Sequence, residues 1–127
     1  MGKVNSHRDL IIWQRGIELV KMVYQLCKSL PQEEIYALQS QLKRSAVSIP
    51  SNIAEGYGRH YTKSYIHFLN IARGSLLELD TQITIAFELE YISKENFEHI
   101  TELIIEENKM INAFIKSVEK STANAID

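Results

Sequence analysis

Residues 62–91 read TKSYIHFLNIARGSLLELDTQITIAFELEY, and they hold the most regular apolar pattern of the chain. Apolar side chains recur there at steps of three and four, the period of one face of an α-helix. They are Tyr65, Leu69, Ala72, Leu76, Leu79, Ile83 and Ala86. Heptad-like spacing is typical of a helix that packs against other helices. Gly74 costs such a helix about 1 kcal/mol relative to alanine, so we expect another helix to approach closely there.

Three further segments of the chain show the same helical period. We expect four helices in all. They span residues 8–29, 33–57, 62–91 and 94–120. Residues 121–127 lack the pattern and are expected to fray.

Two local signals refine this prediction. Ser6 and Asp9 have the spacing of a capping box before the first helix. Pro50 lies inside the second helix, where it removes an N–H donor and its ring clashes with a carbonyl of the preceding turn. Four helices with short connections predict an all-α fold, an antiparallel up-down four-helix bundle whose second helix is kinked near Pro50. The bundle forms a single domain over residues 1–127.

Composition limits the class of protein. A chain of 127 residues, 45% hydrophobic and 24% charged, suits one domain with one core. Its single cysteine, Cys27, excludes an internal disulfide framework, and its place among apolar residues predicts a buried, unreactive thiol. No apolar run approaches the roughly 18 residues of a membrane span, and no secretory signal is evident. We therefore expect a cytoplasmic protein with no membrane partner.

The histidines give no convincing metal site. A di-iron bundle needs two Glu-x-x-His pairs, whereas Glu95 and His99 are four residues apart and no second pair exists. His60 and His67 lie seven apart without a third ligand at helical spacing. No serine nucleophile motif is present either. The sequence predicts no catalytic residues, no metal, no cofactor and no enzyme activity.

The formal net charge of -2 conceals an asymmetry. Residues 1–60 hold eight basic and five acidic side chains, whereas residues 61–127 hold six basic and eleven acidic ones. Basic side chains near tyrosines can bind phosphates and stack on unpaired bases. The candidate nucleic-acid-binding residues are Lys43, Arg44, Arg59 and Lys63.

These cations also have a purely structural interpretation. Lys43 and Arg59 are roughly 24 Å apart along a helix, which makes a stripe instead of a pocket. Arg59 and Glu55 have the spacing of an i,i+4 ion pair, and the remaining cations would then be solvated surface. Charge alone leaves both interpretations open.

The first helix has only a narrow polar strip, with more apolar surface than three neighbouring helices can readily cover. We therefore expect a homo-oligomer. The candidate interface residues are Trp13, Ile17 and Tyr24.

The central stretch QLKRSAVSIPSNIAEGYGR, residues 41–59, resembles the signature of the 23S rRNA intervening-sequence protein family. DLIIWQ at residues 9–14 and FLNIARGSLLELDTQ at residues 68–82 are similar to that family too. The matches together span about residues 8–120. The resemblance implies a four-helix bundle that assembles as a ring, typically a pentamer. Lys43 stands where the family often has arginine, which keeps the charge but loses the bidentate fork.

The resemblance also implies a relation to accessory variability proteins of diversity-generating retroelements, which bind nucleic acid and a reverse transcriptase. The family's name describes where its genes lie more than an activity. We therefore expect a non-catalytic, oligomeric protein that binds the backbone of RNA or DNA. The alternative is a protein-interaction scaffold, such as an accessory subunit that presents the acidic residues of the last helix, within 95–106, to a polymerase-like partner.

Overall fold

The computed structural model of the protein describes residues 3–126, and the side chains of residues 3–121. Within that range the chain forms four α-helices and two short 3-10 helices. The α-helices are α1 (Ile11–Cys27), α2 (Leu38–Tyr57), α3 (Thr62–Glu88) and α4 (Lys94–Ile126). The 3-10 helices are η1 (His7–Asp9) and η2 (Gln32–Glu34).

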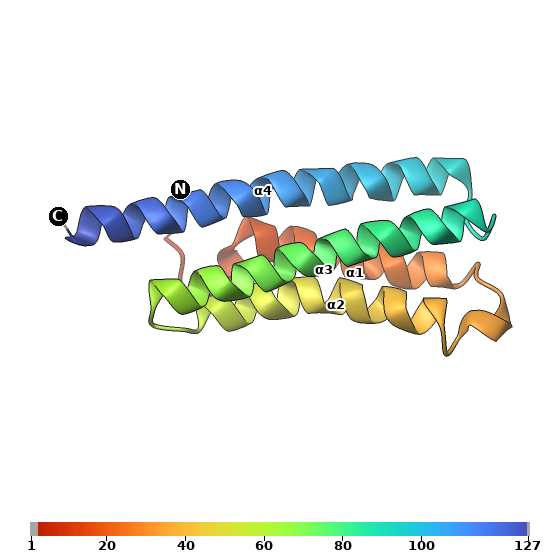
Figure 1. The fold of residues 1–127 in the computed structure, drawn as a ribbon, viewed down its shortest axis with the longest axis horizontal. Coiled ribbons are helices and arrows are strands. Elements are labelled where there is room, and N and C mark those ends of the chain that lie inside the picture. The colour runs from red at the N-terminus through yellow and green to blue at the C-terminus, as the bar shows by residue number, and fades with distance from the viewer. Residues whose placement is uncertain (1–2, 127) are drawn as a thin grey trace.

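The four α-helices lie alongside one another as an elongated bundle, and successive helices run in opposite directions along its long axis (Figure 1). α2 packs against α1 and α3, and α4 packs against α1 and α3. The described residues contain no strand. The all-α fold predicted from the sequence is confirmed.

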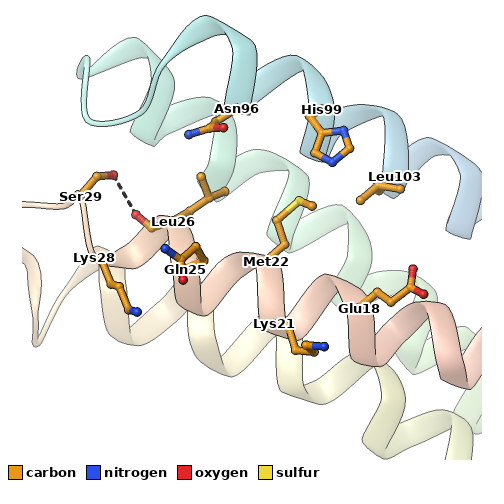
Figure 2. A pocket seen from close by; sticks show the side chains of 10 residues that line it. All are labelled: Glu18, Lys21, Met22, Gln25, Leu26, Lys28, Ser29, Asn96, His99 and Leu103. Carbon is orange, nitrogen blue, oxygen red and sulfur yellow. Dashed lines mark hydrogen bonds between the residues drawn. The ribbon is translucent and has the colours of Figure 1, made fainter.

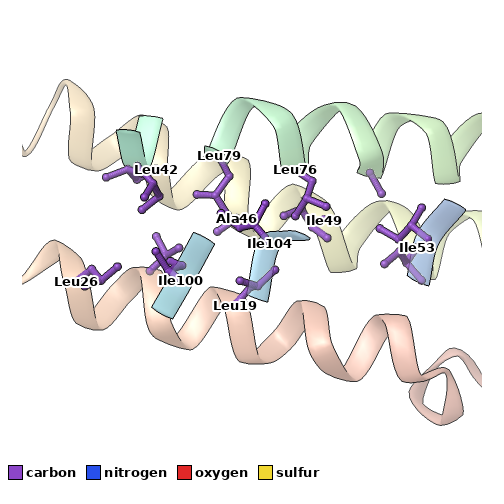
Figure 3. Packing of buried hydrophobic residues seen from close by; sticks show 14 of the residues in the cluster. Leu19, Leu26, Leu42, Ala46, Ile49, Ile53, Leu76, Leu79, Ile100 and Ile104 are labelled. Carbon is purple, nitrogen blue, oxygen red and sulfur yellow. The ribbon is translucent and has the colours of Figure 1, made fainter. Parts of the chain in front are cut away.

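The core is one cluster of buried aliphatic side chains contributed by all four helices. Leu19, Leu42 and Ile100 are among the side chains that meet along the bundle axis (Figure 3). The apolar face predicted for α3 is buried from Leu69 to Ala86. Because such cores are packed without voids, truncating one of these leucines to alanine costs about 2–5 kcal/mol of stability.

Two glycines let neighbouring helices approach. A Cβ on Gly16 of α1 would lie 3.3 Å from the Cβ of Pro50, and a Cβ on Gly56 of α2 would lie 2.9 Å from Cδ1 of Tyr65 on α3. Gly74 does not have the role expected for it within this chain, because a Cβ there would meet no atom of the described residues within 4 Å. Its position on α3 faces outward.

Pro50 lies inside α2, and the helix continues across it. Next to it, Asn52 donates from Nδ2 to the carbonyl of Ser48 at 2.8 Å, and the hydroxyls of Ser48 and Ser75 lie 2.7 Å apart between α2 and α3. The polar side chains around the proline therefore find partners at the helix contact. The kink near Pro50 stays a prediction.

The start of α2 differs from the sequence expectation. It begins at Leu38 instead of residue 33, because the preceding residues form η2 and the carboxylate of Glu34 accepts a hydrogen bond from the Leu38 N–H at 3.3 Å. The chain before α1 also forms a separate 3-10 turn, and the predicted capping box of Ser6 and Asp9 caps that turn.

The ends of α3 and α4 differ too. α3 ends at Glu88, because Glu90 takes a left-handed conformation with φ 64°. α4 continues to Ile126, past the residue where the apolar helical pattern stops, so the backbone of residues 121–126 is helical. Asp127 lies outside the described residues.

Candidate nucleic-acid and assembly surfaces

Lys43 and Arg44 are neighbours in sequence but point in different directions, because successive helical residues are turned by about 100°. The ammonium of Lys43 lies over the ring of Tyr24 on α1, 4.8 Å from its centroid. Arg44 is exposed on the outer face of α2. Lys43 is therefore partly occupied by a cation–π contact, and Arg44 is the more available cation of the two.

The turn between α2 and α3 carries further cations. The guanidinium of Arg59 donates to the carboxylate of Glu55 at 3.0 Å and lies 4.8 Å from the ring centroid of Phe68. Both members of the ion pair are about half exposed, so its contribution to stability is small. Lys63 is exposed on the first turn of α3, and the nearby ring of Tyr61 is 76% exposed.

The predicted binding residues are spread along the molecule, since Arg44 lies about 22 Å from Arg59 along the helix direction, and Lys43 faces a different side. Glu55, eleven residues after Arg44, points within about 20° of it, so Arg44 and Arg59 flank one exposed face of α2. Lys63 continues that surface beyond the turn, whereas Lys43 faces α1. Glu55 pairs with Arg59 and neutralises part of that charge, whereas Arg44 lies about 16 Å from Glu55 along α2. The ion-pair interpretation considered from the sequence is correct for Arg59.

The three candidate interface residues lie on one side of α1. Trp13 and Ile17 are half-buried, and Trp13 contacts the edge of the His7 ring at 5.1 Å between centroids. Tyr24 is 44% exposed beneath Lys43. Much of the apolar surface that motivated this prediction is therefore covered within the chain.

An open groove of about 830 Å³ runs between α1 and α4 (Figure 2). Its floor is apolar, formed by Met22, Leu26 and Leu103, and Met22 points from α1 toward α4. Lys21 and Lys28 line the α1 side. Asn96 and His99 line the α4 side, and Glu18 lies at one end. We call this the α1–α4 groove.

Comparison with known proteins identifies the family of this chain. The model of the family described as 23S rRNA-intervening sequence protein matches residues 8–113. The chain belongs to this family. The resemblance carried by residues 9–14, 41–59 and 68–82 is thereby confirmed.

A solved structure is similar to this family member. It is a crystal structure from Bacteroides thetaiotaomicron, described as a protein with unknown function from the S23 ribosomal protein family. The two are 27% identical with a TM-score of 0.78, and the match covers 84% of this chain and 99% of that one. None of the curated proteins matches the chain.

Glu107 is the feature of this family member that sequence reasoning missed. It lies on the core face of α4, 1% exposed, and neither carboxylate oxygen has a hydrogen-bond partner. Burial raises its pKa to about 8; Arg15 opposes that rise, while Glu106 and Glu18 add to it. The signal was present in the sequence, because residue 107 occupies the apolar step between Ile104 and Ile111.

The sequence also pointed to Cys27 and to possible metal ligands. Cys27 is buried as predicted, and burial raises the pKa of its thiol against an opposing effect of Lys43. Among the residues that the structure describes, no three histidine, cysteine or acidic side chains converge to hold a metal ion. No helix in that part of the chain is both long and apolar enough to cross a bilayer.

Proposed function

We propose that this family member is a non-catalytic, self-assembling protein that binds the phosphate backbone of RNA or DNA. The observation that carries the proposal is the exposed face of α2 flanked by Arg44 and Arg59, with Lys63 and the exposed ring of Tyr61 beyond it. Cations and an aromatic ring are the groups that bind phosphates and stack on unpaired bases.

One protomer offers only a few cations, and Glu55 partly neutralises Arg59. Binding by a single chain is therefore weak. Self-assembly repeats the same face on each copy, so a long polyanion engages several copies at once and gains avidity. The family resemblance suggests a ring of five.

Salt-dependent binding tests this function. Filter binding with mixed RNA and DNA over several salt concentrations should show affinity falling steeply with salt, because bound phosphates release their counterions. Arg44→Ala should weaken binding to all sequences alike, whereas Lys43→Ala should have a smaller effect because Lys43 already contacts Tyr24. Lys109→Ala, which removes an exposed cation of α4, is the matched control.

A change at Glu55 tests the same surface in the opposite direction. Glu55→Gln removes the carboxylate that pairs with Arg59 and should strengthen binding. No binding of the wild type at low salt contradicts the nucleic-acid function. Stoichiometric zinc or iron found by elemental analysis of the purified protein would contradict its non-catalytic part.

A protein-interaction scaffold is the second candidate. Glu95, Glu98 and Glu102 are exposed on one side of α4 and form an acidic surface that suits a basic partner such as a polymerase-like protein. Glu95→Lys with Glu102→Lys should then abolish co-elution with a purified partner. If the protein is a scaffold, the double variant should lose co-elution with the partner, and the wild type should not bind nucleic acid even at low salt.

A further inference from the structure

The outer face of α3 is unusually apolar for an exposed helix surface. Leu77 is 60% exposed, Ile85 43% and Ile71 37%, and Gly74 lies between them with open space beyond it. Glu78 and Glu88 are exposed beside these residues. We call this surface the α3 ridge, and an exposed apolar surface with a helix glycine at its centre is suited to close contact with another protein.

The α1–α4 groove differs from this surface in charge, because lysines line one side of it. Its apolar floor contains Met22, an adaptable side chain, and its exposed cations are Lys21 and Lys28. Glu18 at one end is engaged by Arg15 at 3.4 Å. The groove therefore combines an apolar floor with two exposed lysines, Lys21 and Lys28, on its α1 side.

We propose that the α3 ridge of one copy of this chain seats in the α1–α4 groove of a second copy. This inference rests on the self-assembly in the proposed function and assigns its interface. The ridge supplies leucine and isoleucine side chains to the groove floor, and Gly74 lets the facing backbone approach. Glu78 and Glu88 of one copy face Lys21 and Lys28 of the next.

The two pairs of charges differ in spacing. Lys21 and Lys28 are about 10 Å apart along α1, and Glu78 and Glu88 are about 15 Å apart along α3 and turned by about 80° from each other. Long lysine side chains span the difference. The contact joins two different surfaces, so it is heterologous, and repeating it closes a ring or extends a filament.

Two other occupants fit less well. Two ridges packed on each other would oppose like charges at Glu78 and Glu88. A nucleic acid would meet these same carboxylates on the ridge and an apolar floor in the groove, neither of which suits phosphate. A second copy is the partner whose chemistry matches both surfaces.

Charge exchange tests the interface by light scattering at tens of micromolar protein. Glu78→Lys with Glu88→Lys should weaken assembly by about tenfold or more, and so should Lys21→Glu with Lys28→Glu. Mixing the two double variants, or combining all four changes in one chain, should restore assembly, because opposite charges face each other again. Lys116→Glu with Glu119→Lys, on exposed sites of α4 outside both surfaces, is the control for charge reversal and should assemble normally.

Gly74→Leu gives an independent test that does not depend on charge. The fold should tolerate the new side chain, since nothing lies near Gly74 within the chain, but the side chain should block the second copy. Unchanged helicity by circular dichroism with lost assembly is the expected result. A wild type that is monomeric contradicts the proposed self-assembly itself. A wild type that assembles, with charge variants and Gly74→Leu that assemble equally well, leaves self-assembly standing and overturns this interface.

Discussion

Glu107 is an ionisable residue on the core face of α4, at a position where the turns before and after it carry isoleucine. A buried carboxylate without hydrogen-bond donors is strongly destabilised, so the side chain stays protonated to a higher pH than it would in water. Its nearest cation, Arg15, is half-exposed and already engaged by Glu18. At neutral pH the fold therefore holds an uncharged acid in its core.

This gives a pH dependence of stability with a definite sign. The pKa of Glu107 is about 8 in the folded chain and near its ordinary value in the unfolded chain. Between those values the folded state holds the proton and the unfolded state does not, so the free energy of unfolding falls as pH rises, by up to about 1.4 kcal/mol per unit. The stabilising contribution is fully present below the unfolded pKa and is lost as pH rises to 8.

The variant that checks this is Glu107→Gln. It should raise the free energy of unfolding more at pH 8 than at pH 5, as measured by urea denaturation, because the amide keeps the shape of the protonated acid and never ionises. Equal effects at both pH values would mean that Glu107 titrates normally.

Trp13 gives a second prediction at the level of single residues. Its ring packs against the core, meets His7 edge-on and lies 5.7 Å from the Arg8 guanidinium. Trp13→Ala should therefore lower the free energy of unfolding by about 2–4 kcal/mol in thermal or urea melts. The control Tyr36→Ala removes a ring that is 97% exposed and should change it by less than about 0.5 kcal/mol. Lost assembly with unchanged stability would instead place Trp13 in an interface between copies.

Between elements, the packing of α2 against α3 depends on the absence of a single side chain. A Cβ at Gly56 would lie 2.9 Å from Tyr65, closer than real contacts allow, and 3.0 Å from Phe68, tighter than most. At Gly74 the same atom would meet open space. Two glycines in neighbouring helices thus have opposite structural consequences.

Alanine substitutions at the two glycines should change the free energy of unfolding in opposite directions. Gly74→Ala should stabilise the fold by up to about 1 kcal/mol, because alanine favours the helix and contacts nothing. Gly56→Ala should destabilise it despite the same helical gain, since α3 must move away. Thermal denaturation of the two variants checks the pair, and stabilisation by both would show that α2 and α3 are not held at the distance described.

The helical elements were predictable to the extent that their apolar period was uninterrupted. The face of α3 from Leu69 to Ala86 follows a regular pattern, so its burial could be predicted from spacing alone. The start of α2 could not, because it depends on a hydrogen bond from Leu38 to Glu34 that competes with helical continuation.

The candidate site was less predictable than the helices. The helical period alone indicates that Lys43 and Arg44 point apart. The contact of Lys43 with Tyr24 depends on how α1 and α2 pack. The role of each glycine likewise depends on which helix lies opposite, and periodicity within one helix does not contain that information.

Across the whole bundle, the helices differ in how closely they pack and in how well their buried polar groups are paired. The α2–α3 pair has a glycine contact and a hydrogen bond between Ser48 and Ser75 at its centre. α4 buries Glu107, and most of the buried side-chain oxygens without partners lie on it, at Thr101, Glu107 and Asn108, against one at Gln82 on α3. The C-terminal end of α4 also extends past the ends of the other helices (Figure 1). Regions with these properties open at lower free energy than a well-satisfied core.

Amide hydrogen exchange should therefore resolve two levels of protection. Backbone amides of α4 around Ile104 and Ile111 should exchange about tenfold faster than those of α2 around Ile49, because α4 can detach while α2 and α3 stay paired. Glu107→Gln, compared with the wild type at one pH above 8, should slow exchange in α4 and leave α2 nearly unchanged. Equal protection of α2 and α4 in the wild type would instead indicate that the bundle opens as one cooperative unit, with the cost of burying Glu107 shared by all four helices.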